Sequence, residues 1–136
     1  MARLILDTGV LIAAFRGRLD LAGLLDGDDV AIPCHAVAEY LAGIHLDKDD
    51  GRSVAQREFL EEVLAVVPVE DYTMSVARHH AVQLAEVTRL GIPRGTLDLM
   101  IAATARATGR MLVTTDAKAR FGDLPGVDAR VLSVLS

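Results

Sequence analysis

The chain has 136 residues, a length that suits one domain with one ordinary hydrophobic core. Hydrophobic residues make up 51% of the chain and aromatic residues only 4%, so we expect a core of aliphatic side chains. The net charge of −5 disfavours sequence-independent binding to a long stretch of nucleic acid, which needs a basic face. It does not exclude a nuclease, because metal ions supply positive charge locally.

The sequence also bears on the compartment. Cys34 is the single cysteine, so no internal disulfide forms, and a reducing cytosol fits this composition. Asp7 interrupts the apolar run that follows Arg3, which disfavours a signal peptide, and no apolar stretch approaches the roughly 18 residues of a membrane span. We therefore expect a cytoplasmic protein.

In chain order, the first half opens on a short strand, Leu4-Ile5-Leu6, whose apolar residues indicate burial on both faces. A helix over residues 10–15 with Thr8 as its cap, a short helix over 19–25 and a second strand over 30–32 follow. We then expect a helix over 34–46, a polar loop over 46–53 and a helix over 54–64, together a helical hairpin.

The second half repeats the alternation. We expect a brief strand at 66–67 before Pro68, a long helix over 72–90 ended by Gly91, and a helix from Thr96 to Gly109. A strand over 111–113, a helical turn over 117–121 and an edge strand over 130–132 complete the chain. This order predicts an α/β fold in which residues 1–136 form one domain: a short parallel sheet of four to five strands, covered by helices on both faces.

Four acidic residues stand beside the most apolar segments of the chain: Asp7, Glu39, Asp98 and Asp116. Buried carboxylates are costly unless they are paired or bind a metal. Asp7 and Asp116 follow strands, at the edge where such sheets bind ligands, although helix capping explains either residue equally well. The helix dipole favours Asp98 in its first turn, but the apolar helix around it indicates that Asp98 is partly enclosed.

Glu39 is different, because helical periodicity directs it away from the apolar face of its helix. That pattern favours a solvated glutamate, while small neighbours would let a substrate or another element approach; the apolar face is Val37, Tyr40, Leu41 and Ile44, and the small neighbours are Ala36, Ala42 and Gly43. Clustered carboxylates repel one another, and oxygen ligands suit Mg²⁺ or Mn²⁺. The four histidines show no metal-ligand spacing, and adjacent His79 and His80 point about 100° apart.

Four segments together resemble PIN-domain proteins, and among these the VapC-type toxins of bacterial toxin–antitoxin pairs. The segments are 4–12, 36–43, 98–105 followed by Gly109, and 112–116 followed by Phe121-Gly122. Each segment is weak alone, but four in order along nearly the whole chain are fairly specific. Gly9 departs from the pattern, where we expect Ser or Asn.

The resemblance implies a metal-dependent endoribonuclease in which the four acids hold one or two Mg²⁺ or Mn²⁺ ions. It thereby brings Glu39 into the pocket, against the periodicity of its helix. Thr8 and Thr114 are the implied nearby hydroxyls, and the products are a 5′-phosphate and a 3′-hydroxyl. A water activated by the metal attacks the phosphodiester in line, with Glu39 or Asp98 as candidates for deprotonating it.

The resemblance also implies partners: an RNA substrate, a homodimer and a cognate VapB-type antitoxin that blocks the acidic pocket. We predict RNA contacts for Arg94, Arg16 and Arg18, with ordinary solvated arginines as the equal alternative.

Two other functions stay open. A receiver-like phosphoacceptor module needs an acidic pair after the first strand, whereas Asp7 stands alone, and Glu70 and Lys118 match its other positions poorly. A catalytically inactive PIN-like binding module has no reason to keep four costly acids together.

Overall fold

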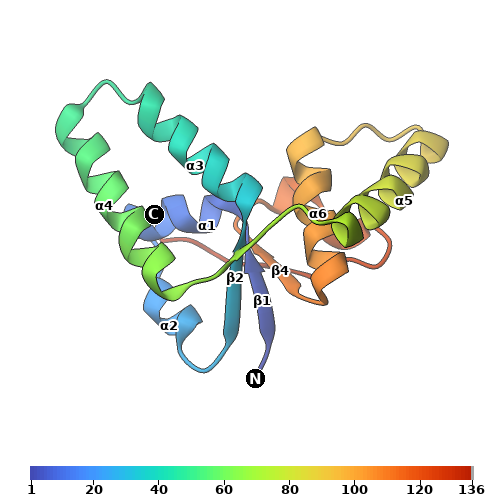
Figure 1. Cartoon of the computed structure of the whole chain (residues 1–136), viewed down its shortest axis with the longest axis horizontal. Helices are drawn as coiled ribbons and strands as arrows, with labels where there is room; N and C mark the ends of the chain where they lie inside the picture. The colour runs from blue at the N-terminus through green and yellow to red at the C-terminus, as the bar shows by residue number, and fades with distance from the viewer. Residues whose placement is uncertain (136) are drawn as a thin grey trace.

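A parallel sheet of five strands forms the centre of the computed structural model, which describes residues 1–135 (Figure 1). Its order is β3-β2-β1-β4-β5, and every neighbouring pair is parallel. The strands are β1 (Arg3–Leu6), β2 (Asp29–Pro33), β3 (Val69–Glu70), β4 (Met111–Thr114) and β5 (Ala129–Val131). The predicted short parallel sheet is therefore confirmed.

Helices cover both faces of this sheet, as predicted. They are α1 (Thr8–Phe15), α2 (Leu21–Leu25), α3 (Cys34–Leu46), α4 (Asp50–Val66), α5 (Met74–Leu90) and α6 (Thr96–Thr108), with two 3₁₀ turns, η1 (Ala117–Ala119) and η2 (Phe121–Asp123). In Figure 1 the α3–α4 hairpin and the α5–α6 pair rise on opposite sides of the sheet. Among residues 1–135, no helix is both long enough and apolar enough to cross a membrane.

The central strand β1 divides its side chains between two hydrophobic cores. Leu4 and Leu6 pack in one core with α1, α3 and α4, while Ile5 between them packs in the other with α6. Successive side chains of a strand point to opposite faces, so a strand covered on both sides must be apolar at every position. This requirement explains the uninterrupted Leu-Ile-Leu run.

The strand order also fixes where a site can form. From β1 the chain moves outward through β2 and β3, and then returns to β4 on the other side of β1. Ligands of such sheets bind at the carboxyl ends of the two strands that flank this reversal. Asp7 follows β1 and Thr114 ends β4, so the reversal brings these two segments together.

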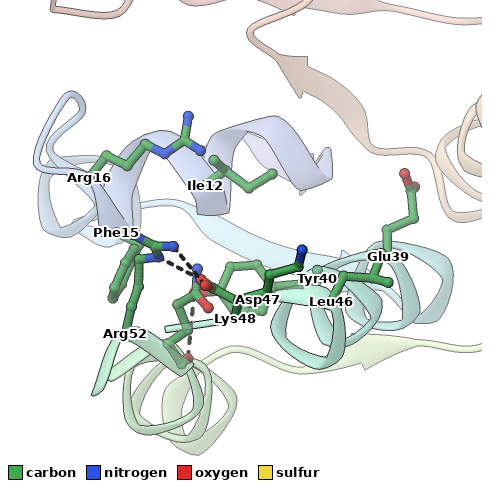
Figure 2. A pocket seen from close by; sticks show the side chains of 11 residues that line it. Ile12, Phe15, Arg16, Glu39, Tyr40, Leu46, Asp47, Lys48 and Arg52 are labelled. Carbon is green, nitrogen blue, oxygen red and sulfur yellow. Dashed lines mark hydrogen bonds and ion pairs between the residues drawn. The ribbon is translucent and has the colours of Figure 1, made fainter. Parts of the chain in front are cut away.

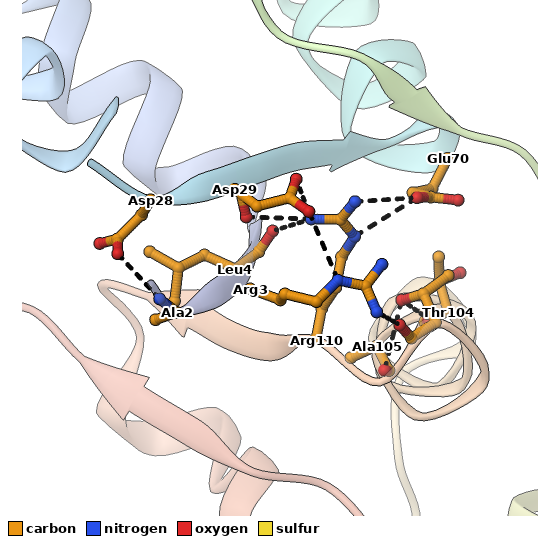
Figure 3. A network of polar contacts seen from close by, with 10 residues as sticks. Ala2, Arg3, Leu4, Asp28, Asp29, Glu70, Thr104, Ala105 and Arg110 are labelled. Atoms are coloured by element: carbon orange, nitrogen blue, oxygen red, sulfur yellow. Dashed lines mark hydrogen bonds and ion pairs between the residues drawn. The ribbon is translucent and has the colours of Figure 1, made fainter. Parts of the chain in front are cut away.

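Away from the segments that contain Asp7 and Thr114, a buried arginine links neighbouring strands of the sheet (Figure 3). The guanidinium of Arg110 donates hydrogen bonds to the carbonyl of Leu4 at 3.1 Å and to the carbonyl and carboxylate of Asp29, each at 3.0 Å. It also forms an ion pair with Glu70. Arg110 thus links β1, β2 and β3 from the start of β4, away from the acids at the other edge.

Several predicted bounds shift by one to four residues, one predicted strand is absent, and the expected helical turn over 117–121 is two 3₁₀ turns. Residues 66–67 do not form a strand: α4 continues through Val66, and the N–H of Val67 donates to the carbonyl of Val63 at 2.8 Å. Val67 is buried in the core next to that helix, so its apolar character serves helix packing. The expected polar loop over 46–53 is also shorter, because Asp49 caps α4 by accepting the N–H of Arg52.

The predicted caps are displaced by one residue. Asp7, not Thr8, caps α1, and Thr8 is its first helical residue. Gly95, not Thr96, precedes α6 as its N-cap and has no side chain to satisfy the helix N–H groups. Both shifts leave a threonine inside the helix with its hydroxyl available for other contacts.

Candidate functional site

Asp7 lies at the centre of the acidic site, between the end of β1 and the start of α1. Its Oδ1 accepts the backbone N–H of Thr8 at 2.8 Å, and its Oδ2 accepts the hydroxyl of Thr114 at 2.9 Å. The backbone N–H of Asp7 donates to the carbonyl of Val113 at 2.9 Å. One carboxylate oxygen is thereby held by the first residue of α1 and the other by the last residue of β4.

Two further acids join Asp7 through the same threonines. The hydroxyl oxygen of Thr114 accepts the backbone N–H of Asp116 at 3.0 Å, and the hydroxyl of Thr8 donates to Oε1 of Glu39 at 3.2 Å. One hydrogen-bond network therefore connects Asp7, Glu39 and Asp116. Glu39 is half-buried and turned toward this network, so the solvated position that periodicity favoured is wrong.

Asp98 approaches the cluster from the first turn of α6 and is half-buried. Its carboxylate folds back over Gly95, with Oδ2 3.4 Å from the place that a Cβ on Gly95 would occupy. Within the described residues, its side chain accepts no hydrogen bond. Its link to the other acids is electrostatic.

The carboxylates affect one another's protonation. Burial raises the pKa of Asp7, and the charge of Asp116 adds to the rise, while the hydrogen bond from Thr114 opposes it. Burial likewise raises the pKa of Glu39, and Asp7 and Asp98 add to it. These repulsions require that the groups lie within electrostatic reach of one another.

The pKa of Asp98 is raised for the same reasons. Burial is the largest cause, the charges of Asp7 and Asp116 add to it, and Arg94 opposes it. Holding several negative charges together in this way costs free energy that a bound cation would recover.

The donor set fits a hard divalent cation, because all four acids offer oxygen and the two threonines orient their carboxylates. Glu39 Oε2 and Asp116 Oδ2 accept no hydrogen bond from residues 1–135 and remain available as ligands. However, no three His, Cys, Asp or Glu side chains in that part of the chain already stand in a metal-binding arrangement. Metal binding at the cluster is therefore a proposal based on its chemistry.

Cationic residues lie on both sides of the cluster. A hollow of about 680 Å³ between α1, α3 and α4 contains Arg16 and Glu39 (Figure 2). A second hollow, of about 380 Å³, contains Asp98 with Arg94, Lys118 and Arg120. The arginine that completes the predicted RNA-binding set, Arg18, lines a third hollow that holds none of the four acids.

Beside Asp98, the cations that the sequence analysis did not predict are Lys118 and Arg120; Lys48 and Arg52 likewise line the hollow that contains Glu39. The sequence could have indicated that Lys118 and Arg120 lie near the acids, because they follow Asp116 by two and four residues. Both side chains are exposed beside Asp98.

Gly9, the departure from the expected pattern, has a structural reason. A Cβ at this position would lie 2.5 Å from Oγ1 of Thr115, a separation that real structures do not tolerate. The space that a Ser or Asn side chain would enter is therefore already taken by the Thr115 hydroxyl.

Known proteins share both the sequence pattern and the fold. Ribonuclease VapC of Rickettsia bellii is 28% identical over 115 residues, covering 85% of this chain and 86% of that protein. The crystal structure of DNA-bound VapBC from Salmonella typhimurium gives a TM-score of 0.82 at 25% identity, covering 96% of this chain and 98% of the other. VapBC2 from Rickettsia felis, bound to a promoter DNA fragment, shares the fold with a TM-score of 0.84 at 22% identity over 96% and 98% of the two chains.

The family comparison covers the whole of the site. The PIN domain family matches residues 4–125, a span that holds all four acids and both threonines. This family match excludes the receiver-like alternative. The chain belongs to the PIN domain family.

Proposed function

We propose that this protein is a VapC-type toxin: an endoribonuclease that uses Mg²⁺ or Mn²⁺ to hydrolyse RNA phosphodiester bonds. The observation that carries the proposal is the convergence of Asp7, Glu39, Asp98 and Asp116 from four separate elements onto one edge of the sheet. The family match and the relative named Ribonuclease VapC support the same activity.

In this proposal the four carboxylates would hold the cation, which when bound would supply positive charge at the scissile phosphate and lower the pKa of the attacking water. Thr114 and Thr8 keep Asp7 and Glu39 in place by donating their hydroxyl hydrogens to them. Glu39 and Asp98, whose pKa values are raised, are the candidates for accepting the proton of the water. The negative cluster would repel RNA without a cation, so activity should require one.

The proposed partners are an RNA substrate, a cognate VapB-type antitoxin and a second copy of the chain. Arg16 and Glu39 line the same hollow, so Arg16 is suited to contact the phosphates of an RNA strand that runs along it toward the acids. The solved VapBC structures are complexes, which supports an antitoxin partner here. An antitoxin with basic side chains would complement the acidic cluster and block it.

Replacement of Asp98 tests the proposed activity. Asp98→Asn keeps the size of the side chain but removes its charge, and we expect RNA cleavage in Mg²⁺ or Mn²⁺ to fall by about 100-fold or more. Growth arrest by the expressed protein should be relieved as well. Cleavage of a labelled RNA by the purified variant, with circular dichroism to establish that it is folded, provides the measurement.

The matched control is Asp71→Asn, which removes an exposed aspartate outside the cluster. It should cleave RNA as the wild type does. Cleavage by Asp98→Asn at the wild-type rate, or wild-type cleavage that persists in excess chelator, would contradict the proposal. A folded wild type that binds RNA but never cuts it would favour the inactive binding module instead.

A further inference from the structure

The carboxylate of Asp98 lacks the hydrogen bonds that hold the other three carboxylates in place. Threonine hydroxyls donate to the carboxylates of Asp7 and Glu39, and backbone N–H groups donate to that of Asp116, whereas the carboxylate of Asp98 accepts no hydrogen bond from the described residues. The N-cap of its helix, Gly95, offers no side chain either. The position of Asp98 relative to Asp116 therefore depends on the packing of α6, where Leu99 shares a core with Phe121, and on how the loop before α6 is attached to the rest of the protein.

Arg94 provides that attachment. One Nη group of its guanidinium donates to the carbonyl of Ala119, and the other donates to the carbonyl of Arg120 at 3.3 Å. The loop before α6 is thereby tied to the turn after β4, 25 residues further along the chain.

The turn that Arg94 holds is the same turn that Asp116 caps. Oδ1 of Asp116 accepts the N–H groups of Lys118 at 3.0 Å and Ala119 at 3.2 Å. Asp116 thus fixes the amino end of η1, and Arg94 fixes its carboxyl end.

The backbone shows why this turn needs a second support. Arg120 adopts a left-handed conformation with φ of 50°, which is unfavourable for a residue other than glycine. Its ion pair with Asp123, at 2.7 Å, and the contact with Arg94 hold it there. Without Arg94, the turn that carries Asp116 would lose the contacts that hold its carboxyl end.

We propose that Arg94 is a positioning residue, which keeps Asp98 and Asp116 at a fixed separation by tying the loop before α6 to the turn capped by Asp116. This inference rests on the proposed function and refines the prediction that Arg94 contacts RNA. Both of its Nη groups already bind backbone carbonyls, whereas Lys118 in the same hollow is exposed and fits an RNA phosphate better.

Two variants of Arg94 separate the roles. Arg94→Lys keeps the positive charge but loses the planar fork that reaches two carbonyls, and Arg94→Gln loses both. A positioning residue predicts that each variant lowers kcat by about 10- to 100-fold with KM nearly unchanged, because a small misplacement of a reacting group is that costly. Arg89→Gln, in the last turn of α5 and exposed, is the matched control.

A second readout needs neither RNA nor metal. Hydrogen exchange of the metal-free protein should become faster at the amides of Lys118 and Ala119 in both Arg94 variants, and should remain at the wild-type rate in Arg89→Gln. Circular dichroism should show that all of these variants are folded.

The inference is overturned if Arg94→Lys keeps the wild-type kcat while Arg94→Gln raises KM, because that pattern belongs to an RNA contact. Unchanged exchange at Lys118 and Ala119 in both variants would overturn it too. If the wild type does not cleave RNA at all, the proposed function fails, and the exchange measurement still shows whether Arg94 holds the turn.

Discussion

At the scale of single residues, the Thr115 side chain occupies the space beside Gly9, close to the acidic site. We predict that Gly9→Ala destabilises the protein, because overpacking costs about 1–3 kcal/mol and exceeds the roughly 1 kcal/mol that alanine gains in a helix. Urea unfolding at neutral pH provides the measurement.

Thr115→Ala removes the hydroxyl that blocks this space, so the double variant tests the cause. Gly9→Ala should cost less in the Thr115→Ala background than in the wild type, by at least about 0.5 kcal/mol of coupling. Strictly additive free energies of unfolding would show that the two side chains do not compete for the same space.

Glu39 shows where local sequence rules stop. The three aspartates follow strands or begin a helix, so general rules about strand ends and helix dipoles locate them. Glu39 lies on the polar side of α3, and only the hydroxyl of Thr8, 31 residues earlier in the chain, reveals that this side faces the other acids. Helical periodicity has no access to such a distant contact, whereas the family resemblance predicted it.

At the scale of elements, the turn between α3 and α4 is stabilised by charge. The Arg52 guanidinium, with the N–H of Asp49, holds the pKa of Asp47 at about 2, below its ordinary value of 3.8. A carboxyl group whose pKa is lowered by folding stabilises the protein above its unfolded pKa and loses that contribution as the pH falls through its folded pKa. The Asp47–Arg52 pair should therefore lose its effect between about pH 4 and pH 2.

Unfolding of the wild type and Arg52→Met across this pH range tests the pair. We expect the wild type to be the more stable at pH 6 and the difference to disappear as the pH approaches 2. Lys48 is an exposed neighbour, and the free energy of unfolding of Lys48→Met should depend on pH in the same way as that of the wild type. A stability difference for Arg52→Met that is independent of pH would mean that the ion pair is not its source.

The helices and strands were predictable to differing extents. Short apolar runs located β1, β2 and β4, because a strand that is buried on both faces is apolar at every position. The edge strand β5 is largely exposed and was located within one residue. The exception is β3, which has only two residues and follows Pro68, so its pattern is too short to read. Val66 and Val67, just before it, resemble a strand in sequence, but Val66 is the last residue of α4 and Val67 packs in the core beside that helix.

At the scale of the whole molecule, the strand order explains how distant residues form one site. The reversal between β1 and β4 places Asp7 beside Asp116, while α3 and α6 bring Glu39 and Asp98 to the same edge. Arg110 links β1, β2 and β3 on the other side of the sheet from the acids. The fold thus concentrates negative charge at one edge, where a cation would stabilise it.

The most direct test of the account is calorimetric titration of the purified protein with Mn²⁺, comparing the wild type with Glu39→Gln. We predict that the wild type binds Mn²⁺ and that Glu39→Gln weakens binding by about 10-fold or more, whereas Glu58→Gln on the exposed surface of α4 has no effect. Equal affinity in Glu39→Gln and the wild type, or no binding by the wild type, would contradict the claim that these four carboxylates form one metal site.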